Sequence, residues 1–163
     1  MRTFLAAALA ILALEASAQS TPAANYTDLW WNPSESGWGV SFTQHAGTNQ
    51  VFAIWYTYDP REPGASSGFK PLWIVMPGGS WTSPTTVTGT VYVANGVPFY
   101  GSGTILREPN NLVAVGSFTF SFSSATTGTF AYNIAAPSGL AATNPAYNLP
   151  AMTGTKSIIR QSF

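Results

Sequence analysis

Three side chains in this sequence invite a catalytic interpretation. Glu35 and Asp59 could form the carboxylate pair of a glycoside hydrolase, although nothing in their spacing requires them to meet. His45 is the only histidine and there is no cysteine, so a zinc site lacks the ligands it needs. A simpler interpretation places Asp59 at the start of a turn and His45 at an exposed strand end. We therefore predict a non-catalytic protein with no metal and no cofactor, with a Glu35/Asp59 hydrolase as an alternative.

The tryptophans are a stronger functional signal than the ionisable residues. All six lie between Trp30 and Trp81, in a chain of which only 7% of residues are charged. Aromatic rings with few charged neighbours suit the C–H faces of sugar rings or small apolar molecules. Large aromatics also dominate small cores, so a structural or interaction domain with every ring buried is the alternative. The residues chosen as candidate ligand contacts are Trp31, Glu35, Trp38, Trp55, Tyr58 and Trp73.

Glu35 has two interpretations of its own. It lies between two serines, just after a turn that begins at Pro33, and could be a polar anchor at the mouth of a barrel. Alternatively its carboxylate accepts backbone N–H bonds, for instance from Gly37 or Trp38. The adjacent pair Trp30 and Trp31 must point to opposite faces if that segment is a strand, so one ring can be core while the other is exposed.

The charge pattern restricts the class of partner. Six basic and six acidic residues give a net charge of zero, and neither sign is clustered. Nucleic acid requires a basic footprint, and docking on anionic lipid requires a polybasic segment. The expected partner is therefore a small molecule or a glycan, and membrane attachment is not expected.

The first residues of the chain have the pattern of an export signal. Arg2 is followed by an apolar run over 4–14 and by Ala16-Ser17-Ala18, a small-x-small cleavage site. The run is shorter than the roughly 20 residues that a spanning helix needs. We therefore predict a signal peptide over 1–18, one domain over 19–163, and a secreted or periplasmic protein.

The remainder of the chain shows alternation with a period of two residues between turn signals, and no stretch has a helical period. Joining such strands in sequence predicts an all-β fold, a single antiparallel up-and-down β-barrel of about eight strands, with a two-sheet sandwich as the alternative. Pro77-Gly78-Gly79 is expected to end the fourth strand, and a further segment at 98–108 is ambiguous. The strands are expected at 26–31, 37–45, 50–59, 70–76, 85–94, 112–123, 127–135 and 154–163.

The sixth strand also allows an outer-membrane barrel. Phenylalanines at 118, 120 and 122 alternate with Ser117, Thr119 and Ser121, as a lipid-facing strand would. Several expected strands are shorter than the roughly 9–11 residues needed to cross a bilayer. The outer membrane therefore remains an alternative location.

Four segments resemble a group of exported proteobacterial proteins that has no assigned activity. They are WWNPSESGWG at 30–39, WYTYD at 55–59, PLW at 71–73 and KSIIRQSF at 156–163. The chain departs from the group by inserts at 60–68 and 137–150. The resemblance implies one domain over nearly the whole exported chain, and no chemistry. A looser resemblance to avidin-type barrels concerns architecture alone.

Overall fold

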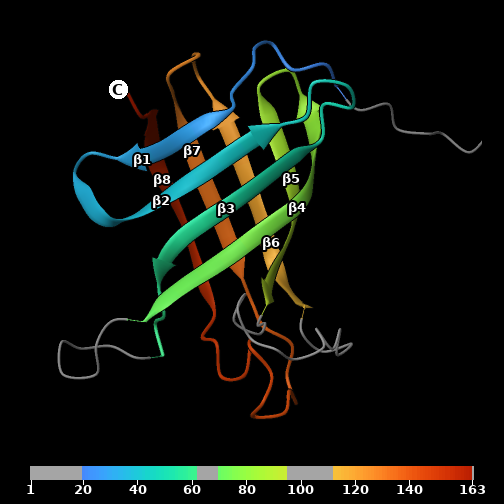
Figure 1. The fold of residues 1–163 in the computed structure, drawn as a ribbon, viewed down its shortest axis with the longest axis vertical. Coiled ribbons are helices and arrows are strands. Elements are labelled where there is room, and N and C mark those ends of the chain that lie inside the picture. Colours follow the sequence, from blue (N-terminus) through green and yellow to red (C-terminus); the bar gives the residue numbers. More distant parts are fainter. Residues whose placement is uncertain (1–19, 62–69, 95–111, 163) are drawn as a thin grey trace, which may run out of the picture.

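The computed structural model describes residues 20–61, 70–94 and 112–162. The predicted signal peptide, the segment 98–108 and nearly all of the insert at 60–68 lie outside these ranges. Eight strands form one closed antiparallel barrel in which each strand pairs with its neighbours in sequence (Figure 1). The strands are β1 (Asp28–Asn32), β2 (Glu35–Gln44), β3 (Val51–Tyr58), β4 (Pro71–Ser83), β5 (Thr86–Ala94), β6 (Leu112–Phe122), β7 (Thr127–Ile134) and β8 (Met152–Arg160).

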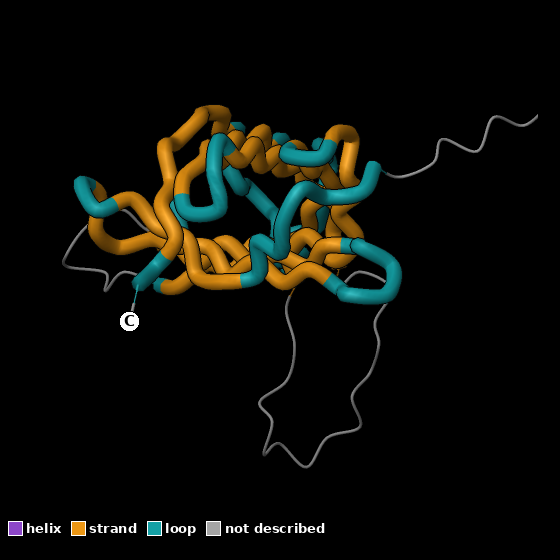
Figure 2. The backbone as a smooth tube through the Cα atoms, turned by 90° about the horizontal axis from the view of Figure 1, so that it is seen from above, coloured by secondary structure: helices purple, strands orange, loops and turns teal. Residues whose placement is uncertain are grey.

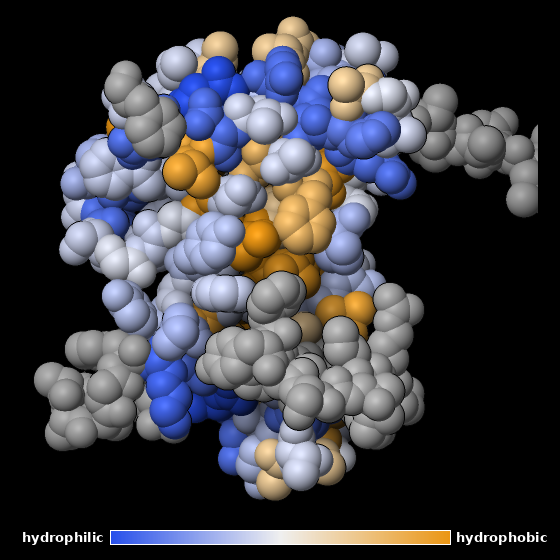
Figure 3. Space-filling model, viewed as in Figure 1, coloured by the Kyte–Doolittle hydropathy of each residue, from blue (hydrophilic) through white to orange (hydrophobic). Residues whose placement is uncertain are grey.

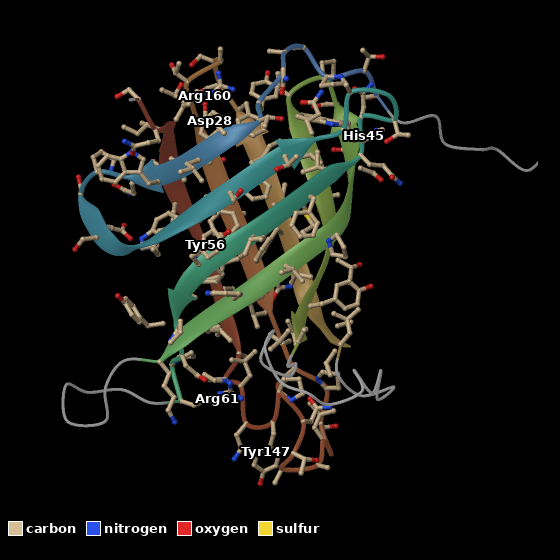
Figure 4. All side chains as sticks on the ribbon, viewed as in Figure 1. Asp28, His45, Tyr56, Arg61, Tyr147 and Arg160 are labelled. Carbon is tan, nitrogen blue, oxygen red and sulfur yellow. The ribbon has the colours of Figure 1, made fainter. Side chains whose placement is uncertain are left out.

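The all-β class and the up-and-down barrel are confirmed, and pairing of β1 with β8 excludes the two-sheet sandwich. This closing pairing is short, with only Trp30 opposite Arg160 and Trp31 opposite Ile159. Arg160 reinforces it, because its guanidinium carbon lies 5.3 Å from the centre of the Trp30 ring. Its Nη2 donates to the Asn25 carbonyl at 2.8 Å, and Asp28 lies at the same end of the barrel (Figure 4).

The expected end of the fourth strand is wrong. β4 continues through Pro77 and Gly78 to Ser83, and its pairing with β5 shifts between Val75 and Ser80. Pro77 cannot donate a ladder hydrogen bond, so the strand accommodates it in a bulge rather than ending. The bulge needs a glycine at position 79. A Cβ there would lie 2.6 Å from the Met76 side chain and 3.2 Å from those of Val51 and Val87.

Hydrophobic side chains fill the interior, and no polar or charged residue in the described ranges is buried. On β6, Phe118, Phe120 and Phe122 all point inward. A membrane barrel has the opposite arrangement, with apolar residues outside and polar residues inside. The lipid-facing interpretation of these phenylalanines is therefore wrong. The largest fully buried side chains are Trp30, Phe42, Phe118, Phe120, Phe130, Ile74 and Met76.

Segments outside the strands cover both ends of the barrel. At one end Tyr26 stacks on Phe122, with ring centres 4.0 Å apart, and loops cross over the interior when it is seen from above (Figure 2). At the other end the loop after β7 buries Ala146 and Leu149. Arg61 holds this loop through 2.9 and 2.8 Å bonds from Nη1 to the carbonyls of Pro145 and Tyr147. Nowhere in the described ranges is there a helix with the length and apolar character to cross a membrane.

Candidate functional site

Strand geometry divides the six tryptophans between the inside and the outside of the barrel. Trp30 is buried and its neighbour Trp31 faces outward, which confirms the opposite-face prediction for this pair. Trp81 is also buried, and its indole N–H donates to the Asn49 carbonyl at 2.8 Å. Trp30 and Trp81 therefore belong to the core, and Trp31 does not.

Trp55 belongs to the interior. Its residue is 8% exposed, and its ring packs 5.5 Å from Phe130 and 4.8 Å from Tyr132, measured between ring centres. The aromatic interior leaves Trp55 no exposed face on which a ligand could stack. Its contribution is therefore to the packing of the barrel.

The outer face of β3 and β4 carries the exposed rings. Trp73 is 62% exposed, Tyr58 51% and Tyr56 38%. Tyr56 is opposite Trp73 in the register, and their ring centres lie 6.1 Å apart with the planes nearly perpendicular at 80°. Tyr56 projects from the middle of this face (Figure 4). We call four of the outward rings, those of Trp31, Tyr56, Tyr58 and Trp73, the outer aromatic face.

Two glycines on β2 form the floor between these rings. Gly39 is opposite Tyr56 in the register, and its missing side chain leaves space beside the tyrosine. Gly37 has a φ of +95°, which favours glycine, and a Cβ there would lie 3.2 Å from the Tyr58 ring. The Tyr58 ring therefore lies directly on the backbone of β2.

Three hollows lie along this surface. The first, of about 400 Å³, lies between Trp31 and Tyr56, and the second, of about 290 Å³, between Tyr56 and Trp73. The third, of about 380 Å³, continues from Trp73 to Asp59 and Arg61. We call the three together the aromatic groove. Hydrophobic residues also gather at the centre of this side of the barrel (Figure 3).

A fourth hollow, of about 410 Å³, lies over β6, β7 and β8. Its lining is mainly small and polar, including Ser117, Thr119 and Asn133. It offers little aromatic surface for stacking, so the aromatic groove is the stronger candidate for a binding site.

Glu35 lies near the groove and is held by side chains. Its carboxylate accepts a 3.1 Å bond from the Trp38 indole N–H, and its Oε2 lies 2.9 Å from the Lys156 ammonium nitrogen. The predicted backbone donors are therefore wrong, because the described donors to this carboxylate are all side chains. Lys156 and the Trp38 N–H stabilise the charged form and hold the pKa of Glu35 below its ordinary value of 4.5. Glu35 positions Trp38, which lines the second hollow.

The Glu35–Lys156 pair predicts a defined pH dependence of stability. Folding lowers the pKa of Glu35, so the charged carboxylate stabilises the folded protein above pH 4.5. This stabilisation is lost as the pH falls through the lower pKa of the folded state. The hydrogen bond that Lys156 donates to the Glu35 carboxylate also raises the pKa of Lys156 above 10.5, so the pair is intact between these limits. Glu35→Gln should lower the melting temperature at pH 7 relative to the wild type. In acid, where Glu35 is protonated, the two proteins should melt at similar temperatures, as measured by circular dichroism. Lys156→Met is the matched variant, and additive losses in the double variant would contradict the pairing.

The other ionisable candidates have structural roles. The Asp59 carboxylate accepts the Arg61 backbone N–H at 3.0 Å, which confirms its turn, and lies 2.6 Å from the guanidinium, which lowers its pKa. Both Asp59 and Glu35 are therefore paired with a cation, and neither has the raised pKa that a general acid requires. His45 accepts a bond from the Thr48 backbone at a strand end. No group of three possible metal ligands exists in the part of the chain that the structure describes.

The sequence prediction missed Tyr56 and Gly39. The available signal was the two-residue alternation on β3: if Trp55 is core, Tyr56 and Tyr58 must share the outer face. Of the predicted site residues, Trp31, Tyr58 and Trp73 lie on that face, Trp38 and Glu35 lie beside it, and Trp55 lies inside. No family model, curated protein or solved structure matches the chain.

Proposed function

We propose that this protein is an exported, non-catalytic module that binds a neutral glycan on its outer aromatic face. The observation that carries the proposal is the position of Trp73, which is 62% exposed and stands against Tyr56 beside a glycine floor. An indole that is left in water on a rigid strand is available to stack on the C–H face of a sugar. Export remains a prediction from the sequence, as does the resemblance to the proteobacterial group.

The surroundings of the rings favour a neutral ligand. The residues that line the first and second hollows include no charged side chain. In the third hollow the single cation, Arg61, is bonded to Asp59. Among the described residues, an anionic or cationic ligand in the first two hollows would therefore meet no lining side chain of opposite charge to compensate its desolvation. A sugar chain without charged groups needs no such compensation.

The filled interior explains why the outer surface is the candidate. An eight-stranded barrel has just enough internal space for side chains or one small ligand. Here rings such as Phe118, Phe120 and Phe130 occupy that space and are fully buried. The small-ligand pocket considered from the sequence would have to displace them. Conversely, a domain with every aromatic in its core does not account for the exposure of Trp73.

Trp73→Ala is expected to weaken binding to an insoluble neutral polysaccharide without unfolding the barrel. Loss of one stacked aromatic costs about 1–3 kcal/mol for nucleobases, which corresponds to roughly a 5- to 150-fold loss of affinity. The change in stability should stay within about 0.5 kcal/mol, because the side chain is mostly exposed. Depletion from solution by cellulose, chitin and xylan measures the binding.

Leu112→Ala is the matched control for this experiment. Leu112 is similarly exposed, at 53%, but lines none of the three hollows. It should leave polysaccharide binding unchanged. Equal binding by wild type, Trp73→Ala and Leu112→Ala would refute the outer aromatic face as the ligand site.

A further inference from the structure

The three hollows of the aromatic groove lie next to one another and form a track. The first and second share Gly39 and Tyr56 as lining residues. The second and third share Pro71 and Trp73. Each boundary therefore contains one aromatic side chain, Tyr56 or Trp73, that lines the hollows on both of its sides.

The track is longer than a single sugar ring. It runs from Trp31 on β1 across β2 and β3 to Trp73 on β4. Neighbouring strands are about 4.8 Å apart, so these three steps cover about 14 Å before the third hollow begins. A monosaccharide would occupy one hollow and leave the others exposed to water.

The perpendicular rings favour a series of linked units. The Tyr56 and Trp73 planes meet at 80°, so the two rings do not form one flat platform. Sugar rings in adjacent hollows would contact the same aromatic side chain between them. The linkage between two sugars must then cross the edge of an aromatic ring, which an extended chain can do.

The far end of the track is rigid and polar. Arg61 is fixed by Asp59 and by the carbonyls of Pro145 and Tyr147 (Figure 4). The third hollow therefore has a fixed outer wall, where polar groups can face sugar hydroxyls. The opposite end, at Trp31 and Leu29, is apolar.

We infer that the aromatic groove binds an extended neutral polysaccharide, with one sugar unit in each of three consecutive hollows. This inference rests on the proposed function and adds the length and path of the ligand. The polysaccharide lies across the strands, from Trp31 past Tyr56 and Trp73 to the turn that contains Arg61. Binding free energy accumulates as successive hollows are filled.

The test is calorimetric titration of the folded protein with cello-oligosaccharides and chito-oligosaccharides, from the disaccharide to the hexasaccharide. Affinity for one of the two series should rise about tenfold or more from the disaccharide to the trisaccharide, which fills the three hollows; this is about 1.4 kcal/mol. Beyond the length of the groove it should rise no further.

Two variants test the ends of the track separately. Trp31→Ala removes the wall of the first hollow, and Ala94→Trp fills the third hollow without deleting Arg61. Each should lower the affinity for the trisaccharide to near that for the disaccharide, while thermal stability controls for folding. Trisaccharide binding that neither variant weakens would overturn the three-hollow path.

The outcomes separate this inference from the function on which it rests. If all lengths bind equally and Trp73→Ala abolishes binding, the glycan-binding function stands and the extended path is wrong. If no oligosaccharide of either series binds and the insoluble polysaccharides do not bind either, both proposals are wrong.

Discussion

Replacing Phe130 with alanine is expected to lower the free energy of unfolding by about 3–5 kcal/mol, the usual cost of deleting a fully buried phenylalanine. The Phe130 side chain is completely buried on β7. Its ring centre lies 4.9 Å from that of Phe118, 5.0 Å from that of Phe120 and 5.5 Å from that of Trp55. Phe118 and Phe120 come from the neighbouring strand β6, and Trp55 comes from β3 across the barrel, so the cavity would open in the core and could collapse only partly. Urea denaturation followed by tryptophan fluorescence measures the loss.

Phe52→Ala is the matched control for this variant. Phe52 carries the same ring on β3 but is 42% exposed, so its replacement should cost less than about 1 kcal/mol. A typical domain is stable by only 5–15 kcal/mol, and the Phe130 variant should therefore unfold at clearly lower urea. Equal midpoints for the two variants would show that the aromatic cluster does not hold the barrel together.

Gly116→Ala is expected to be at least as damaging, for a backbone reason. Gly116 has a φ of +143°, which side chains rarely adopt, and it lies where the pairing of β5 with β6 shifts. A Cβ at this position would overlap the carbonyl oxygen of Asn133 on β7. Backbone strain of about 1–3 kcal/mol would add to the cost of separating the two strands. We expect a loss of about 3 kcal/mol or more, measured by the same urea denaturation.

Two other glycines separate the contributions to this loss. A Cβ at Gly78 meets nothing within 4 Å, and Gly78 has no positive φ, so Gly78→Ala should be close to neutral. Gly139 also has open space but a φ of +74°, so its alanine variant isolates the strain. If the Gly116→Ala and Gly139→Ala proteins are equally stable, the predicted free-energy cost of separating β6 from β7 is wrong.

These core positions and the outer aromatic face should respond differently to mutation. Phe130→Ala and Gly116→Ala act on the barrel and should lower glycan binding only where they unfold it. Trp73→Ala should lower glycan binding and leave the barrel folded, because the Trp73 ring lies outside the core. The contrast distinguishes a binding surface from a cluster that merely stabilises the fold.

Local patterns in the amino-acid sequence were enough to predict the strands and much of their orientation. Period-two alternation placed Phe118, Phe120 and Phe122 on one face of one strand, and adjacency alone placed Trp30 and Trp31 on opposite faces. The turn at Asp59 was also predictable, since its carboxylate accepts a bond from a backbone N–H two residues further on. All of these relations are local, and a strand satisfies them without any partner.

The exposure of individual tryptophans could not be predicted from local patterns, because it depends on how the strands pair. Trp73 and Trp81 are eight residues apart on β4, so simple alternation would place them on the same face. The bulge between Val75 and Ser80 reverses the alternation, which leaves Trp73 outside and Trp81 buried. The ion pair between Glu35 and Lys156 joins residues far apart in sequence, across the region where the barrel closes. Register, bulges and closure arise from pairing between strands, and that pairing placed Trp73 beside Tyr56 and created the groove.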